Sequence, residues 1–273
     1  MAVQMKRPRG RPRLLDGPKE GETVQSLDRS IALLTLIAQE AGLTLTQAAN
    51  AAGLAPSTAH RILTTLQRHG LVEFEEGAQH WHIGVEAFRI GSSFLRRRKI
   101  VDRSRPVMQD LVQACGETAN LAVADEDAVV FASQVETHAP IRAFFRPGTR
   151  SPFHASGVGK AMLAHRPREA VRALVDRVGL ERFTSRTLTT LDGLVADLDR
   201  IRDRGFSIDD EERNEGMRCV AAPIFNEFGE PVAAVSLSGP AMRMTPDAVD
   251  RLGPVVAAAA GRITQAIAGT PPG

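Results

Sequence analysis

The segment 154–161, "HASGVGKA", combines glycines with a lysine and therefore invites comparison with loops that cradle phosphate groups. A phosphate-binding loop requires Gly six positions before Lys160 and Ser or Thr directly after it, but His154 and Ala161 stand there. The dinucleotide-binding pattern also fails, because Met162 occupies the place of its third glycine. What remains is a glycine-containing turn entering a helix, whose free N–H groups suit one small anion such as a carboxylate. A helix start that needs glycine only for close packing is the alternative.

The segment 205–223, "GFSIDDEERNEGMRCVAAP", holds the second group of candidate residues. Its acids at 210–212 are interpreted as a solvated loop, and Cys219 on an apolar strand as a buried structural thiol. A nucleophilic Cys219 would need a histidine base, which the spacing neither supplies nor excludes. No second Cys and no nearby His stands at ligand spacing from Cys219, so we expect no metal site and no cofactor.

The elements that must position these residues lie between 106 and 268, where extended and helical stretches alternate. We expect two strands within 118–135 around an acidic turn, a third over 141–148, and others over 205–210, 218–226 and 231–239. Helices are expected over 155–165, 167–178, 194–205 and 245–268, the last capped by Thr245. Strands grouped in hairpins with flanking helices predict an α+β domain with a mostly antiparallel sheet.

Residues 24–83 show a different pattern, with three short helices followed by a hairpin around Gly77. Ser26 is the expected cap of the first helix, and Thr44 with Gln47 forms a capping box for the second. The third helix begins near Pro56. The face of the first helix expected to be buried consists of Leu27, Ile31, Leu34 and Ala38. Three helices and a hairpin predict a winged helix-turn-helix.

The outward face of the third helix is rich in hydroxyl and cationic side chains, and no acid occurs between Pro56 and Gly70. Such a face can enter the major groove of double-stranded DNA and donate to base edges and phosphates. A merely solvated polar face is the alternative. The DNA-contacting residues expected on this helix are Ser57, Thr58, His60, Arg61, Thr64 and Arg68.

Residues 1–13 contain five cations and no acid, whereas the rest of the chain is slightly acidic. Within this arm, "PRGRP" resembles the core of an AT-hook, in which Arg9 and Arg11 would lie in a narrow A/T minor groove. A disordered tail that attracts phosphates without specificity is the equal alternative. We interpret residues 1–23 as this arm and a linker.

The composition limits the class of protein and its expected location in the cell. Apolar residues make up 43% of the chain and charged residues 24%, as in soluble globular proteins. Two cysteines, the lack of an apolar stretch of about 18 residues and the lack of a signal-peptide pattern predict a cytoplasmic protein without membrane contact.

Residues 24–74, and above all "AAGLAPSTAHRILTTL" at 51–66, resemble the DNA-binding domain of the IclR family of bacterial transcription regulators. The resemblance continues to about residue 268. It implies a winged helix-turn-helix domain over 24–83, a linker helix over 84–105, a GAF-like effector-binding domain over 106–268 and a tail over 269–273. Family members assemble dimers through the N-terminal domain, which implies a homodimer or homotetramer on a pseudo-palindromic operator.

The second half is most similar to the acetate operon repressor branch of the family, through the segments 154–161, 206–219 and 233–240. In that branch glyoxylate or pyruvate is bound. The resemblance assigns this role here to Gly157, Val158, Asp209, Cys219, Ser236, Leu237 and Ser238. Backbone N–H groups and serine hydroxyls would receive the carboxylate, whereas Asp209 would accept from a hydroxyl group of the ligand.

The predicted function is a DNA-binding transcriptional regulator, a repressor, whose operator binding is modulated by a small carboxylate effector. The alternative is an IclR-type activator or repressor of another carbon-catabolic operon, with a sugar acid or aromatic acid as effector. An enzyme acting on a small keto or hydroxy acid through Asp209 and Cys219 is a remote alternative, because it leaves the winged helix unexplained.

Overall fold

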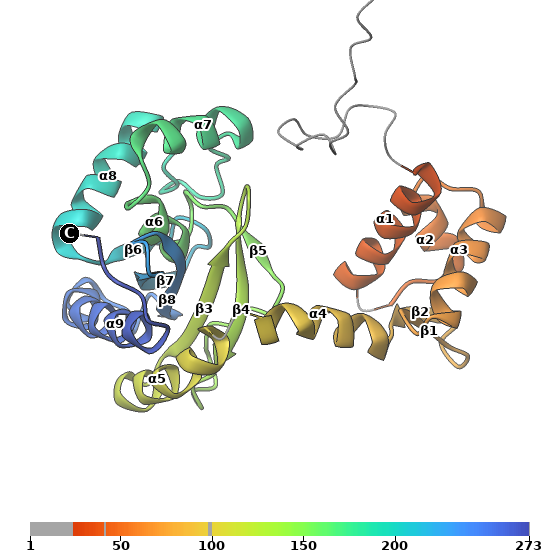
Figure 1. Ribbon diagram of the computed structural model, residues 1–273, viewed down its shortest axis with the longest axis horizontal. Helices are drawn as coiled ribbons and strands as arrows, with labels where there is room; N and C mark the ends of the chain where they lie inside the picture. Colours follow the sequence, from red (N-terminus) through yellow and green to blue (C-terminus); the bar gives the residue numbers. More distant parts are fainter. Residues whose placement is uncertain (1–23, 41, 98–99, 273) are drawn as a thin grey trace, which may run out of the picture. The chain divides into compact units, whose positions relative to one another are not determined.

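The computed structural model describes residues 24–40, 42–97 and 100–272 (Figure 1). Contacts divide the chain into two compact units, the first ending at Phe94 and the second beginning at Leu95. The basic arm, with Arg9 and Arg11, lies outside the described residues.

The first unit contains α1 (Gln25–Gln39), α2 (Leu45–Ala51), α3 (Pro56–Arg68) and the antiparallel hairpin of β1 (Val72–Glu75) and β2 (His80–Ile83). The predicted capping box is confirmed, since the Thr44 hydroxyl accepts from the Gln47 N–H and the Gln47 side chain accepts from the Thr44 N–H. Three helices and a hairpin around one core form the predicted winged helix-turn-helix. Its buried apolar residues are Leu33, Ile37, Ala48, Ala49, Ala59, Leu63, Leu66, Val72 and Trp81.

Two predictions about α1 were wrong. Its N-cap is Val24, whose side chain makes no capping hydrogen bond, so Ser26 already lies inside the helix. The buried residues are Leu33 and Ile37, whereas Leu27 and Ile31 are 56% and 54% exposed. The helix carries two apolar stripes, and periodicity alone does not tell which one α2 and α3 cover.

Where one linker helix over 84–105 was expected, the structure describes α4 (Val85–Arg97) and α5 (Ile100–Cys115). Helix α5 runs through Pro106, which lies inside it instead of starting a new domain. Its buried residues Ile100, Val107, Met108 and Leu111 belong to the main core of the second unit, and Ile100 lies in the first turn. The first turn of α5 is therefore part of that core, although the sequence assigned it to the linker.

The second unit is built on a six-stranded sheet in the order β5-β4-β3-β8-β7-β6, with every neighbouring pair antiparallel. The strands are β3 (Thr118–Ala124), β4 (Val129–Val135), β5 (Arg150–Ser151), β6 (Ser207–Asp210), β7 (Met217–Phe225) and β8 (Pro231–Pro240). The strand expected over 141–148 does not form. This stretch is irregular and ends in a turn, and only the two residues of β5 join the sheet.

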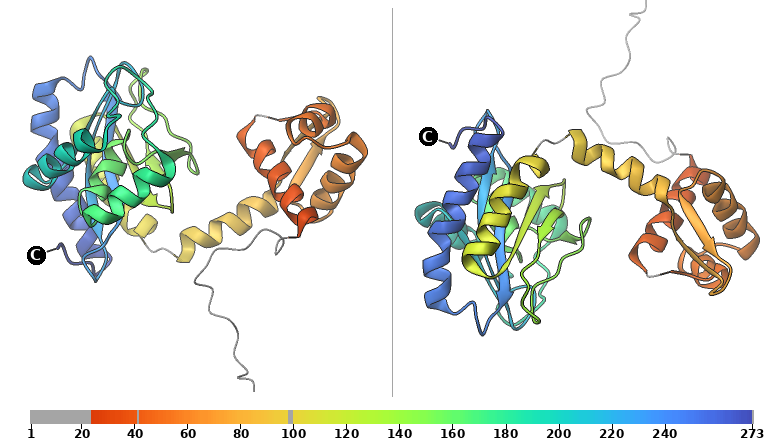
Figure 2. Two further views of the ribbon diagram at one scale, coloured as in Figure 1. Left: turned by 90° about the horizontal axis from the view of Figure 1, so that it is seen from above. Right: turned by 90° about the horizontal axis from the view of Figure 1, so that it is seen from below.

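Helices cover both faces of this sheet (Figure 2). Helix α5 and the closing α9 (Pro246–Ala266), which Thr245 caps as predicted, share one core with one face of the sheet. Helices α6 (Gly157–Leu163), α7 (Arg168–Val178) and α8 (Leu191–Arg204) share a second core with the other face. The α+β fold with an antiparallel sheet is thus confirmed. No helix in the described part of the chain is long and apolar enough to cross a membrane.

Candidate functional site

The predicted DNA-contacting residues share the outer side of α3. Ser57, His60, Arg61, Thr64 and Arg68 are exposed, and Thr58 is half-buried. The opposite side of the helix buries Ala59, Leu63 and Leu66, which fixes the orientation of the polar face. Neither arginine forms an ion pair with any residue that the structure describes. Both guanidinium groups therefore stay available for a phosphate or a base edge.

The surroundings of α3 add one cation that sequence reasoning missed. Arg29 of α1 lines a shallow groove together with Thr58 and Arg61. The hairpin, in contrast, supplies no cation: its strands and turn carry three glutamates, one of which, Glu75, contacts His82 at 3.1 Å. Helix α3 and its neighbour α1 thus present exposed arginines, whereas the hairpin presents glutamates.

In the second unit, residues far apart in the sequence line a cavity of about 30 Å³. Five of the seven predicted effector-binding residues are among them: Gly157, Val158, Asp209, Cys219 and Ser238. The start of α6 and the ends of β6, β7 and β8 supply these residues. The cavity therefore lies between α6 and one face of the sheet, at the place where the resemblance located an effector.

The start of α6 explains both glycines of the "GVG" turn. The Ser156 hydroxyl caps the helix by accepting from the Gly159 N–H at 3.2 Å. The N–H groups of Gly157 and Val158 precede the first intrahelical hydrogen bond and have no acceptor within the helix. A Cβ on Gly159 would lie 2.3 Å from the Phe153 carbonyl oxygen, whereas one on Gly157 would lie 2.9 Å from the Cys219 sulfur. Gly159 thus serves close packing, and Gly157 keeps the cavity open.

The sheet forms the floor of the cavity. Cys219 pairs with Ser238 across β7 and β8, and the Asn120 amide of β3 donates to the Ser238 hydroxyl at 3.3 Å. Ser236 is fully buried on the same face, below the cavity lining. Leu237 packs in the core on the opposite face, because neighbouring strand residues alternate. Its side chain therefore does not reach the cavity.

Aromatic rings form a wall of the cavity, although not all of the phenylalanines near the turn take part. Phe131 of β4 and Phe145 stack with their centroids 4.5 Å apart and both line the cavity. Phe144 is exposed and Phe153 is buried in the core beneath α6. The wall therefore combines Phe145, from the irregular stretch before β5, with Phe131 of β4.

Burial perturbs the carboxyl and the thiol group that line the cavity. It raises the pKa of Asp209 to about 6, although the carboxylate accepts the Glu212 backbone N–H at 2.8 Å. Burial also raises the pKa of the Cys219 thiol to about 12, so this cysteine stays protonated at neutral pH. A protonated thiol is a weak nucleophile, which argues against a catalytic role. Asp209, in contrast, can change its charge close to physiological pH.

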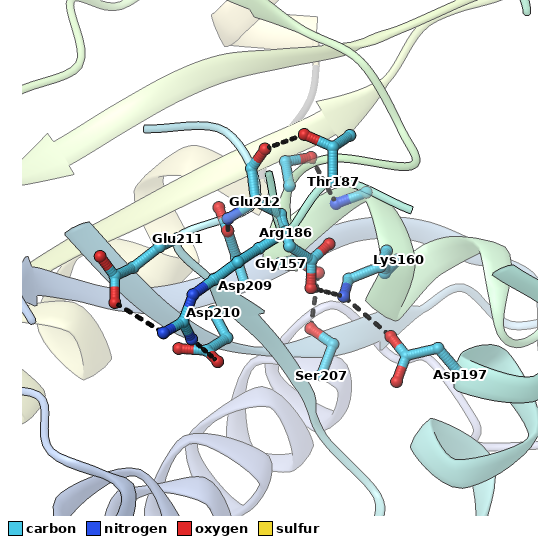
Figure 3. A network of polar contacts seen from close by, with 12 residues as sticks. Gly157, Lys160, Arg186, Thr187, Asp197, Ser207, Asp209, Asp210, Glu211 and Glu212 are labelled. Carbon is cyan, nitrogen blue, oxygen red and sulfur yellow. Dashed lines mark hydrogen bonds and ion pairs between the residues drawn. The ribbon is translucent and has the colours of Figure 1, made fainter. Parts of the chain in front are cut away.

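A buried ionic cluster lies beside the cavity (Figure 3). The Lys160 ammonium of α6 donates to Asp197 of α8 at 2.8 Å and to Glu212 at 2.5 Å, and all three groups are buried. Burial disfavours the ammonium, but the two carboxylates outweigh that effect and raise the pKa of Lys160. Burial raises the pKa of Glu212 to about 7. The cluster fixes α6 and the Asp209–Glu212 turn relative to each other.

The prediction that residues 210–212 form a solvated acidic loop was wrong. Glu212 is 7% exposed and accepts a hydrogen bond from Lys160. Asp210 and Glu211 both accept from Arg218. The acidic run instead supplies partners for Lys160, which is 52 residues from Glu212, and for Arg218 on the neighbouring strand β7. A larger hollow of about 450 Å³ lies beyond this cluster, lined by residues of α8, β6 and α9, and contains none of the predicted effector residues. The predicted effector residues therefore gather at the smaller cavity and not at the larger hollow.

Comparison with known proteins agrees with this architecture. Residues 26–76 match the IclR helix-turn-helix domain, and residues 92–265 match the C-terminal domain of bacterial IclR transcriptional regulators. The chain belongs to the IclR family. It is 50% identical to the HTH-type transcriptional regulator BhcR of Paracoccus denitrificans over 90% of this chain and 88% of that protein. It is 43% identical to the transcriptional repressor IclR of Escherichia coli, over 96% of both chains.

Solved structures of IclR regulators share the fold. The IclR protein of Thermotoga maritima matches 89% of this chain and 98% of its own, with a TM-score of 0.74 and 28% identity. As a member of the IclR family, the chain is a DNA-binding transcriptional regulator, and the enzyme hypothesis is set aside. Four residues that line or support the cavity were missed by sequence reasoning, because distant elements bring them there: Asn120, Phe131, Lys160 and Arg213.

Proposed function

We propose that this IclR regulator is a repressor whose operator affinity is set by a small oxo acid, such as glyoxylate or pyruvate, in the α6 cavity. The observation that carries the proposal is the chemistry of this cavity: two free N–H groups, a serine hydroxyl and an aspartate with a raised pKa. Its volume of about 30 Å³ favours a ligand of few atoms. An apolar cavity that accepts benzene measures about 150 Å³. An aromatic acid would therefore require the walls to move.

The polar groups fit the two ends of such a ligand. The N–H groups of Gly157 and Val158 receive the carboxylate, aided by the partial positive charge of the helix start. Asp209 accepts from a hydroxyl of the hydrated aldehyde or ketone at the other end. The Ser238 hydroxyl, which already accepts from Asn120, has its own proton left to donate.

On the DNA side, the polar face of α3 enters the major groove, and Arg61 and Arg68 contact bases or phosphates. The exposed apolar stripe formed by the cap residue Val24 and by Leu27 and Ile31 of α1 supports association of two copies through the first unit. A homodimer, or a tetramer of two such dimers, would read a pseudo-palindromic operator. An effector that binds one of two conformations of the protein more tightly by about 1–3 kcal/mol would change operator affinity by about 5–150-fold.

The test combines operator binding with an effector titration. We expect wild-type protein to bind one promoter fragment more tightly than random duplex, and glyoxylate or pyruvate to change that affinity. The double variant Ser57→Ala, Arg61→Ala should lose the preference, whereas Arg168→Ala, which breaks only an exposed ion pair with Asp199, should retain it.

Two outcomes would contradict the proposal. Equal affinity of the wild-type protein for promoter and random DNA at moderate salt would remove the DNA-binding part. A response to benzoate or gluconate, with none to glyoxylate or pyruvate, would instead support the alternative of a different carbon-catabolic effector.

A further inference from the structure

One positive charge in the wall of the α6 cavity has no negative partner. The cations that line this cavity are Arg213 and Arg218. Arg218 donates to Asp210 at 2.5 Å and to Glu211 at 3.0 Å, so its charge is already matched. Arg213 forms no ion pair with any residue in the described ranges. Its Nη1 atom is buried and has no hydrogen-bond acceptor there.

The guanidinium group of Arg213 is nevertheless held in place. It lies over the ring of Phe183, with 3.8 Å between its central carbon and the ring centroid. Phe183 is itself fixed, because its N–H donates to the Thr187 hydroxyl at 3.0 Å and its ring stacks on His154. A cation oriented by stacking but left without an anion is organised in advance for a ligand. A buried donor without an acceptor also carries a desolvation cost that a ligand acceptor would remove.

The charges around the cavity indicate that the ligand carries a negatively charged group. Lys160 is the nearest buried ammonium, but it is already paired with Asp197 and Glu212. Asp209 adds a carboxylate to the wall, and this carboxylate repels an incoming anion. The N–H groups at the start of α6 provide hydrogen bonds but no full charge. Among the described residues that line the cavity, Arg213 alone can neutralise an anionic ligand.

We propose that Arg213 is a binding residue of the effector site and the counter-ion of the effector's carboxylate. This inference rests on the proposed function and deepens it, because it makes the negative charge of the ligand, and not only its shape, the basis of selection. Arg213 places the carboxylate at the α6 side of the cavity, with the N–H groups of Gly157 and Val158. The other end of the ligand then faces Asp209.

The test compares an acid with its neutral amide. Arg213→Met removes the charge and keeps an apolar contact with Phe183, and Arg172→Met removes an equal charge from the exposed side of α7 as a control. Calorimetry measures the Kd of pyruvate and of pyruvamide for each protein. A hydrogen bond to a charged group contributes about 1.5–3 kcal/mol, so we expect the Kd of pyruvate to rise about 10–100-fold in Arg213→Met. The Kd of pyruvamide and effector-free operator binding should stay within about twofold.

Arg213→Gln gives the same comparison if the methionine variant does not fold. An equal rise in the Kd of pyruvate and of pyruvamide would mean that Arg213 contributes only packing, which would overturn the inference. An unchanged Kd for pyruvate would overturn it as well, while leaving the proposed function intact. If the wild-type protein binds neither glyoxylate nor pyruvate, both the proposed effector class and this inference fail.

Discussion

Replacing Asp209 by Asn should stabilise the second unit while weakening its effector site. Burial raises the pKa of Asp209 to about 6 from an ordinary value of 3.8. A carboxyl group with a raised pKa binds its proton more tightly in the folded state, so the free energy of unfolding falls as the pH rises from about 4 through 6. A pKa shift of about two units corresponds to about 3 kcal/mol in the free energy of unfolding. Asp209→Asn should thus gain up to about 3 kcal/mol at pH 8 and roughly half of that at pH 5.

The assay is urea unfolding at pH 5 and pH 8, followed by far-ultraviolet circular dichroism. The fluorescence of Trp81 supplies an internal control, because the chain's one tryptophan lies in the core of the first unit. Its transition should not respond to Asp209→Asn. The same variant should bind glyoxylate more weakly, since a neutral amide oxygen is a poorer acceptor than a carboxylate. A gain in stability with a loss of binding is the expected mark of a functional residue.

A destabilisation of the second unit by a similar amount at both pH values would contradict the predicted gain for Asp209→Asn. That result would mean that the hydrogen bond from Glu212 to the carboxylate outweighs its desolvation. Asp199→Asn is the matched control, because Asp199 is an exposed acid paired with Arg168 and Arg202 on the surface. An exposed pair contributes about 0–1 kcal/mol, so this variant should show no comparable gain at pH 8.

Three further predictions test the cavity, its support and the arm. Gly157→Ala places a methyl group 2.9 Å from the Cys219 sulfur, so calorimetry should show effector affinity reduced at least about tenfold, with operator binding retained. Lys160→Met leaves two buried carboxylates without a cation and should cost about 3–5 kcal/mol in denaturant unfolding; a loss below about 1 kcal/mol would contradict the role of the cluster. Deleting residues 1–13 should reduce the salt dependence of DNA binding, since residues 24–83 carry only three arginines against five carboxylates. A loss confined to A/T-flanked operators would favour groove reading by Arg9 and Arg11, and an equal loss on all DNA a nonspecific tail.

Local signals predicted most of the first unit. The capping box at Thr44, Pro56 at the start of α3 and the turn around Gly77 each depend on neighbours within a few residues, and each appears as expected. The polar face of α3 could also be predicted, because helical periodicity separates it from Ala59 and Leu63. The buried face of α1 could not be, since a helix with two apolar stripes is oriented by the elements packed against it.

For the proposed effector site, the sequence by itself determined the residue types: a glycine turn entering a helix, an aspartate near the end of a strand, and serines alternating with apolar residues along β8. Alternation even implies that Leu237 and Ser238 face opposite sides of the sheet. Which charges meet was decided only by the tertiary structure. Lys160 lies 52 residues from Glu212, and Arg213 ends over Phe183 in a wall of the cavity. Pairing of buried charges depends on distance in space and on exclusion of water, and neither is encoded in local spacing.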